Sequence, residues 1–129
     1  MTALLLVGLG GALGALGRYG LARWAQARRT PNWPWATFAA NVLGSVVLGI
    51  ALVLADGLPL LFIGVGFCGG LTTFSSFAAD VLMLIQAGRR PAAAAYAVGS
   101  ILAGLLALLV GLVLGGWISG AAPTAFGWV

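Results

Sequence analysis

Long apolar runs, separated by short polar or turn segments, set the pattern of this chain. The runs cover about residues 3–22, 33–55, 60–86 and 92–117. The hydrocarbon core of a bilayer is about 30 Å thick, and a helix needs about 20 apolar residues to cross it. Each run therefore predicts a transmembrane helix. The 129 residues together predict a single all-α integral membrane domain with four spans.

The third run has an unusual length and an unusual centre. A continuous helix over residues 60–86 would be about 40 Å long, which exceeds the bilayer core. Four glycines lie within residues 64–70, and Thr72 and Thr73 follow them. Glycine and β-branched residues weaken a helix. A tilted helix with close packing is one interpretation, but the pattern favours a break in the middle of the membrane.

Composition excludes most soluble functions. Apolar residues make up 62% of the chain and charged residues only 6%, whereas a soluble domain carries about 25% charge. Histidine, lysine and glutamate are absent from the sequence, so no nucleophile and base pair for hydrolysis is predicted. Cys68 is the only cysteine, which excludes an intrachain disulfide and favours a packing role.

The few charges are distributed unevenly along the chain. The positive ones are Arg18, Arg23, Arg28, Arg29, Arg89 and Arg90, and the negative ones are Asp56 and Asp80. Five arginines fall in the segments after the first and third spans, which lie on one side of the membrane. This bias predicts one orientation, with both termini outside. Because the arginines serve as topology signals, nucleic-acid binding is not predicted.

Small residues recur at helical spacing in two spans. Span four carries one at every fourth position, namely Gly99, Ala103, Ala107, Gly111 and Gly115. Span one carries Gly10 and Gly14 at the same spacing. Such ridges let membrane helices approach closely, so the sequence predicts a compact bundle that forms an oligomer.

Two polar side chains within the spans have more than one interpretation. Arg18 lies toward the end of span one, where it either extends to the lipid headgroups or attracts an anion at a water-filled vestibule. Asn41 lies about one third of the way into span two. Its amide either joins two helices or contacts a ligand.

Hydroxyl groups and aromatic rings cluster in spans three and four. Phe74 and Phe77 share a helix face, and rings at this spacing usually pack, although their positive edges can also meet an anion. Ser75 and Ser76 stand between them. Tyr96 and Ser100 present two hydroxyls on one face of span four. Because these spans offer many donors and little negative charge, a dehydrated anion is the ligand that suits them.

Three stretches of the sequence resemble the Fluc (CrcB) family of fluoride channels. They are residues 10–19 (GGALGALGRY), 37–49 (TFAANVLGSVVLG) and 66–77 (GFCGGLTTFSSF). They occur in the family's order and lie on three of the four predicted spans. The resemblance implies an antiparallel, dual-topology dimer in the inner membrane, with two pores along the subunit interface. Fluoride would leave the cytoplasm through these pores passively.

The resemblance also implies roles for individual residues. Asn41 matches the pore asparagine, and Phe74 and Phe77 match the rings whose edges line the ion path. The implied polar track is Ser75, Ser76, Tyr96 and Ser100, and the implied vestibule residue is Arg18. A structural Na⁺ is implied on the two-fold axis of the dimer, bound through the backbone carbonyls of Gly69 and Thr72.

Alternatives remain open at this point. A small proton-coupled multidrug exporter also has four spans, but it needs a membrane carboxylate in an early span, and spans one and two contain none. A non-transporting assembly subunit is a third interpretation. The one-sided arginines would suit a pair of different chains with opposite orientations, but the homodimer is favoured because both half-sites of a symmetric pore are expected in this chain.

Overall fold

The computed structural model describes residues 1–28 and 33–120 and is helical throughout its spans. The long helices are α1 (Thr2–Ala27), α2 (Trp35–Leu54) and α6 (Arg90–Ile118). The third span is composite and consists of α3 (Gly57–Leu60), the π-helix η1 (Leu61–Cys68), α4 (Gly69–Leu71) and α5 (Phe74–Gln86).

All four predicted spans are confirmed as helices long and apolar enough to cross a membrane, with 26, 20, 30 and 29 residues. The boundaries shift by a few residues, because α1 continues to Ala27 and α2 begins at Trp35. The chain is a multi-pass membrane protein. Arg29 and the C-terminal tail from residue 121 lie outside the described residues.

The third span is broken at the position that the sequence favoured. Thr72 and Thr73 leave the helix with extended backbone angles, at φ −75° and ψ 155° for Thr72 and φ −152° and ψ 123° for Thr73. The preceding glycines do not break the helix, since η1 and α4 run through them. The break therefore belongs to the threonine pair alone.

The glycines instead serve close packing between α1 and the first half of the third span. A Cβ atom at Gly10 or Gly14 would overlap a carbonyl oxygen of η1, from Phe62 or Phe67 respectively. A Cβ atom at Gly70 would overlap the carbonyl oxygen of Gly11 on α1. The close-packing interpretation thus holds for the glycines, and the break holds for Thr72 and Thr73.

The helices α2 and α6 form a second close pair. Gly49 and Gly111 face each other across it, and a Cβ atom at either one would overlap backbone of the opposite helix. Gly115 lies against Val53, with its ideal Cβ 2.8 Å from that residue's Cβ. The predicted ridge of small residues on span four is confirmed at Gly111 and Gly115, whereas Gly99 faces open space.

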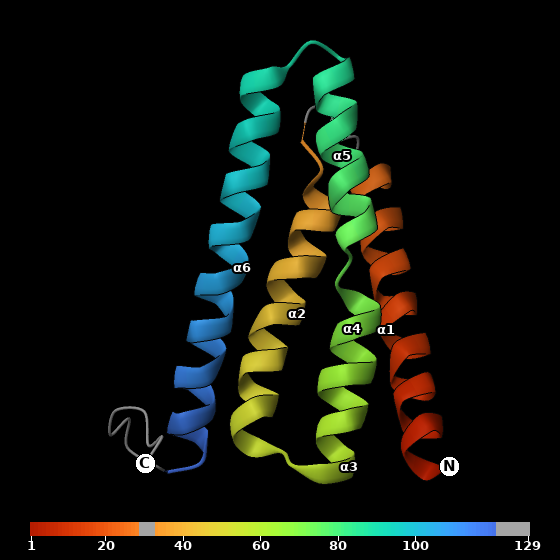
Figure 1. Ribbon diagram of the computed structural model, residues 1–129, viewed down its shortest axis with the longest axis vertical. Helices are drawn as coiled ribbons and strands as arrows, with labels where there is room; N and C mark the ends of the chain where they lie inside the picture. Colours follow the sequence, from red (N-terminus) through yellow and green to blue (C-terminus); the bar gives the residue numbers. More distant parts are fainter. Residues whose placement is uncertain (29–32, 121–129) are drawn as a thin grey trace.

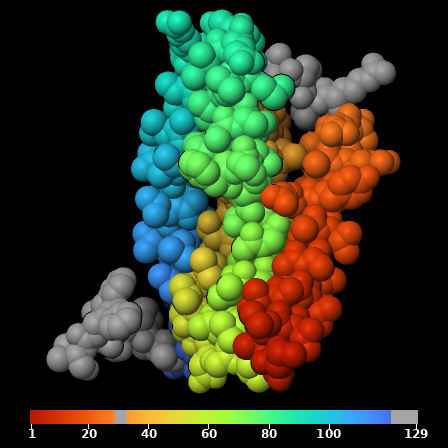
Figure 2. Space-filling model, turned by 45° about the vertical axis from the view of Figure 1, so that its right-hand side comes forward, coloured from red at the N-terminus to blue at the C-terminus, as the bar shows by residue number. Residues whose placement is uncertain are grey.

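The two close pairs lie side by side in the bundle (Figure 1). In Figure 2, the lower part of α1 lies against the third span, whereas its upper part stands away from α5. The end of α1 and the α5–α6 turn, which carry Arg23, Arg28, Arg89 and Arg90, lie at the same end of the bundle. Asp56 lies at the opposite end, before α3.

Candidate functional site

The break in the third span is held by the side chain of Asn41 on α2. Asn41 Nδ2 donates to the Thr73 carbonyl oxygen at 3.2 Å, and the Thr73 N–H donates to Asn41 Oδ1 at 2.8 Å. The amide thus satisfies both backbone groups of an extended residue, as a neighbouring strand would. Backbone groups freed within a membrane require such partners. We call these two bonds the Asn41–Thr73 pair.

The Asn41–Thr73 pair confirms the helix-joining interpretation of Asn41. It does not use up the amide, because Nδ2 carries a second N–H and Oδ1 a second lone pair. Asn41 also lines a cavity beside the break. The ligand role that the resemblance implies therefore remains compatible with the geometry and stays a prediction.

Thr73 also begins the next helix. Its Oγ1 accepts from the Ser76 N–H at 3.2 Å and donates to Ser76 Oγ at 3.2 Å. Ser75 Oγ lies 3.2 Å from the same oxygen. A threonine that caps a helix in this way fixes where the helix starts. The hydroxyls of Ser75 and Ser76 thus belong to the cap of α5 and not to the cavity wall.

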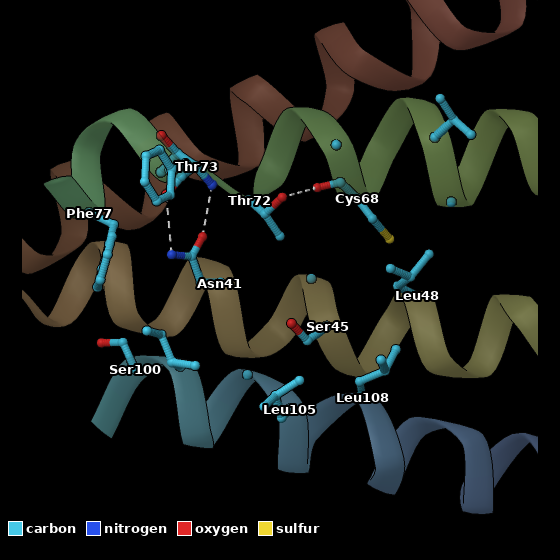
Figure 3. Close-up of a pocket in the computed structure, with 17 residues that line it drawn as sticks. Asn41, Ser45, Leu48, Cys68, Thr72, Thr73, Phe77, Ser100, Leu105 and Leu108 are labelled. Atoms are coloured by element: carbon cyan, nitrogen blue, oxygen red, sulfur yellow. Dashed lines mark hydrogen bonds between the residues drawn. The ribbon is translucent and has the colours of Figure 1, made fainter. Parts of the chain in front are cut away.

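A cavity of about 590 Å³ lies between α2, α6 and the two halves of the third span (Figure 3). Apolar side chains form most of its wall. Its polar side chains are those of Asn41, Ser45, Thr72, Thr73 and Ser100, and its aromatic rings are those of Phe74 and Phe77. No carboxylate stands among the described residues that line it.

The two phenylalanines occupy different environments at one end of the cavity. Their ring centroids lie 5.9 Å apart with planes tilted by 41°. Phe74 is 80% exposed on the single chain, whereas Phe77 is half-buried and lies 5.6 Å from the ring of Tyr96. An 80% exposed ring next to a break in the middle of a membrane span leaves a large apolar face uncovered.

Tyr96 sits at the centre of a buried aromatic cluster. It is fully buried, and the ring of Trp33 meets it edge-on at 5.4 Å. Its hydroxyl donates to Asp80 Oδ2 at 3.3 Å, so Asp80, in the middle of α5, is engaged. One turn along α6, the Ser100 hydroxyl is buried and makes no hydrogen bond with any residue of 1–28 or 33–120.

The carbonyls predicted to bind Na⁺ have both lost the donors that a continuous helix would supply. The Thr73 N–H would reach the Gly69 carbonyl in such a helix, but it bonds to Asn41 instead. The Ser76 N–H would reach the Thr72 carbonyl, but it bonds to Thr73 Oγ1. Gly69 is also exposed. Free backbone oxygens beside a helix break are the ligands that a hard cation takes, so this donor set fits Na⁺.

The predicted site residues therefore divide into two groups. Asn41, Phe74, Phe77 and Ser100 lie around one cavity, together with Gly69 and Thr72. The others stand outside its wall within a single chain, namely Arg18, Ser75, Ser76 and Tyr96.

Comparison with known proteins identifies the family. The family described as CrcB-like protein, Camphor Resistance (CrcB), matches residues 5–112. The chain belongs to the CrcB family. A CrcB relative from Thermus thermophilus is 46% identical over 121 residues, which cover 90% of this chain and 95% of the relative. A second, from Phocaeicola vulgatus, is 38% identical over 124 residues, which cover 92% and 99%. Both relatives are named fluoride-specific ion channel FluC.

Two residues of this CrcB site were not predicted from the sequence. Thr73 provides both the backbone partner of Asn41 and the cap of α5. Ser45 stands in the cavity wall. Its spacing of four residues from Asn41 was the available signal, since residues four apart share a helix face.

Proposed function

We propose that this chain forms a channel through which fluoride leaves the cytoplasm passively. The observation that carries the proposal is the cavity, whose wall offers an amide, hydroxyls and ring edges and contains no carboxylate among the described residues. A small anion that enters an apolar span must exchange its water shell for partial positive charges. The names of the CrcB relatives supply the identity of the ion.

Liposomes containing the purified protein and loaded with potassium fluoride test this proposal. Addition of a K⁺ ionophore should release fluoride at a rate that scales with the protein content. The same liposomes loaded with potassium chloride are the control. Absence of fluoride release, or equal release of chloride, would refute a fluoride-selective channel.

The proton-coupled exporter fits the structure less well. Such an exporter needs a carboxylate that binds a proton within the membrane. The helices α1 and α2 contain none, and Asp56 lies in the turn before α3. Asp80 accepts a hydrogen bond from Tyr96. A non-transporting subunit predicts no flux and no effect of replacing Asn41.

The functional unit that we propose is an antiparallel homodimer in the inner membrane. A second copy would cover the exposed ring of Phe74 and would bring a second break beside the first. The pore along the interface would then run past Asn41 and the two phenylalanines, with Ser75, Ser76, Tyr96 and Ser100 as its polar track. Arg18 would attract fluoride at the vestibule.

The one-sided arginines are the observation that favours the competing assembly, a pair of different chains with opposite orientations. Labelling of tags at both termini in intact cells separates the two. Labelling of each tag from both sides of the membrane supports the homodimer. Labelling from one side only, together with flux that depends on a second chain, would replace it with the mixed pair.

We also propose that Na⁺ binds the carbonyl oxygens of Gly69 and Thr72 at the two-fold axis of the dimer. Their lost helical donors support this assignment. The ion would supply a fixed positive charge that links the two breaks. Replacement of Na⁺ by a large organic cation during purification should weaken the dimer, as measured by its dissociation on dilution in detergent. An unchanged dimer would argue against a structural Na⁺.

A further inference from the structure

Ser45 stands on α2 one helical turn after Asn41 and lines the same cavity. Its hydroxyl makes no hydrogen bond with any residue in the described part of the chain, and the side chain is only partly buried. Figure 3 shows the side chain in front of α2, with its oxygen turned toward the Asn41 end of the cavity. The hydroxyl proton is therefore available to a ligand in the cavity.

The other hydroxyls of the cavity are committed or covered. Thr72 Oγ1 donates to the Cys68 carbonyl at 2.9 Å, and Thr73 Oγ1 donates to Ser76 Oγ. The Ser100 hydroxyl has no partner among residues 1–28 and 33–120 but is buried. Among the described wall residues, Ser45 thus carries the hydroxyl that is both uncommitted and open. On the side of Ser45 away from Asn41, the apolar side chains of Leu48 and Leu108 follow along the cavity (Figure 3).

Gly104 on α6 keeps this hydroxyl open. An ideal Cβ atom at Gly104 would lie 3.7 Å from Ser45 Oγ, with no other atom of a neighbouring residue within 4 Å. Close packing does not require a glycine here, in contrast to Gly49 and Gly111, where a Cβ would overlap backbone. An alanine would fit at this position, and its methyl group would lie against the Ser45 hydroxyl.

We propose that the Ser45 hydroxyl is a further fluoride contact, one turn past Asn41, and that Gly104 leaves it accessible. This inference rests on the proposed function. An anion that leaves the amide of Asn41 would meet the Ser45 hydroxyl as the next donor before the apolar side chains that follow it. A hydroxyl donates one strong hydrogen bond to a bare anion and so replaces one water of its shell.

Two substitutions test the inference from opposite sides of the cavity. Ser45→Ala removes the donor, and Ser45→Thr retains it. Gly104→Ala places a methyl group against the hydroxyl at ordinary contact distance and therefore leaves the fold intact. Gly99→Ala is the matched control, because it lies on the same helix and its Cβ meets no atom within 4 Å. Each variant is compared with the unmodified protein in the liposome efflux assay at equal protein content.

We expect Ser45→Ala to lower fluoride efflux about tenfold, since hydrogen bonds to charged groups are typically worth about one such factor or more. Ser45→Thr should restore most of the rate, and Gly99→Ala should leave it unchanged. Gly104→Ala should slow efflux in the presence of Ser45 and add little in the Ser45→Ala background. This non-additivity separates a covered hydroxyl from simple narrowing of the cavity.

The outcomes distinguish this inference from the function on which it rests. If the unmodified protein releases no fluoride, the proposed function fails. If it releases fluoride and the rate of Ser45→Ala matches it within about twofold, the Ser45 contact alone is refuted. If Gly104→Ala slows efflux equally in the unmodified protein and in Ser45→Ala, Gly104 only widens the cavity and does not act by keeping the Ser45 hydroxyl accessible. Should Ser45→Ala fail to fold, Ser45→Cys, which keeps a side chain of similar size but is only a weak donor, replaces it in both comparisons.

Discussion

The Asn41–Thr73 pair leads to a prediction that links the stability of the break to ion flux. Asn41→Leu keeps the branched shape and the number of non-hydrogen atoms of the side chain but removes both hydrogen bonds to Thr73. The N–H and the carbonyl of Thr73 are then left without partners inside a membrane span. Re-formation of a continuous helix would require Thr72 and Thr73 to change conformation together and would displace α5, whose start is fixed by the Thr73 cap.

The magnitude follows from the two groups left unpaired. Each buried backbone group without a partner costs about 1–3 kcal/mol, so the variant loses about 2–6 kcal/mol of local stability. At about 1.4 kcal/mol for each factor of ten, the lower end corresponds to roughly thirtyfold more frequent opening. Because Phe74 follows Thr73 directly, we expect fluoride flux to fall as well.

Hydrogen–deuterium exchange of the Thr73 amide, followed by mass spectrometry, measures this opening beside the efflux assay. The control is Leu43→Ala, which changes an exposed position on the same helix. Exchange at Thr73 should accelerate in Asn41→Leu and not in the control. Unchanged exchange together with lost flux would show that Asn41 acts on the ion alone, and would refute the reasoning from the break.

Three further predictions concern neighbouring features. Phe74→Ile and Phe77→Ile should each slow fluoride efflux more than about tenfold without changing the oligomeric state on size-exclusion chromatography, because an aliphatic chain lacks a positive ring edge; unchanged efflux in both would reduce the rings to packing. Thr73→Val removes the cap of α5 and should cost about 1 kcal/mol, seen as faster exchange of the Ser76 amide. Gly14→Ala should lower the thermal stability in detergent through overlap with backbone, whereas Gly20→Ala, which meets no atom within 4 Å, should not.

The sequence predicted the spans and the break because both depend on local composition. The apolar runs matched the helices within a few residues. The break was predicted from glycines and threonines together, yet only Thr72 and Thr73 leave the helix. Glycine weakens a helix and also permits close packing, and only the position of α1 decides which property applies.

Contacts between residues far apart in the sequence could not be predicted from the hydrophobic pattern. Asn41 and Thr73 are 32 residues apart, and the sequence of neither segment identifies the other as its partner. The π-helix η1 was not predicted, because the composition of its eight residues does not distinguish it from an α-helix. The bond from Tyr96 to Asp80 spans 16 residues and joins two helices. Such pairings require the packing angles of the bundle.

The two backbone-to-backbone contacts divide the subunit into two stiff halves. One consists of α1 with η1 and α4, and the other of α2 with α6, and in neither does a side chain separate the chains at the closest approach. The cavity lies along the seam between these halves, which the Asn41–Thr73 pair bridges. Within each half the helices are therefore expected to move together as one body. Any shift of one half against the other would reach the cavity first at the amide of Asn41, since its two bonds hold the halves together there.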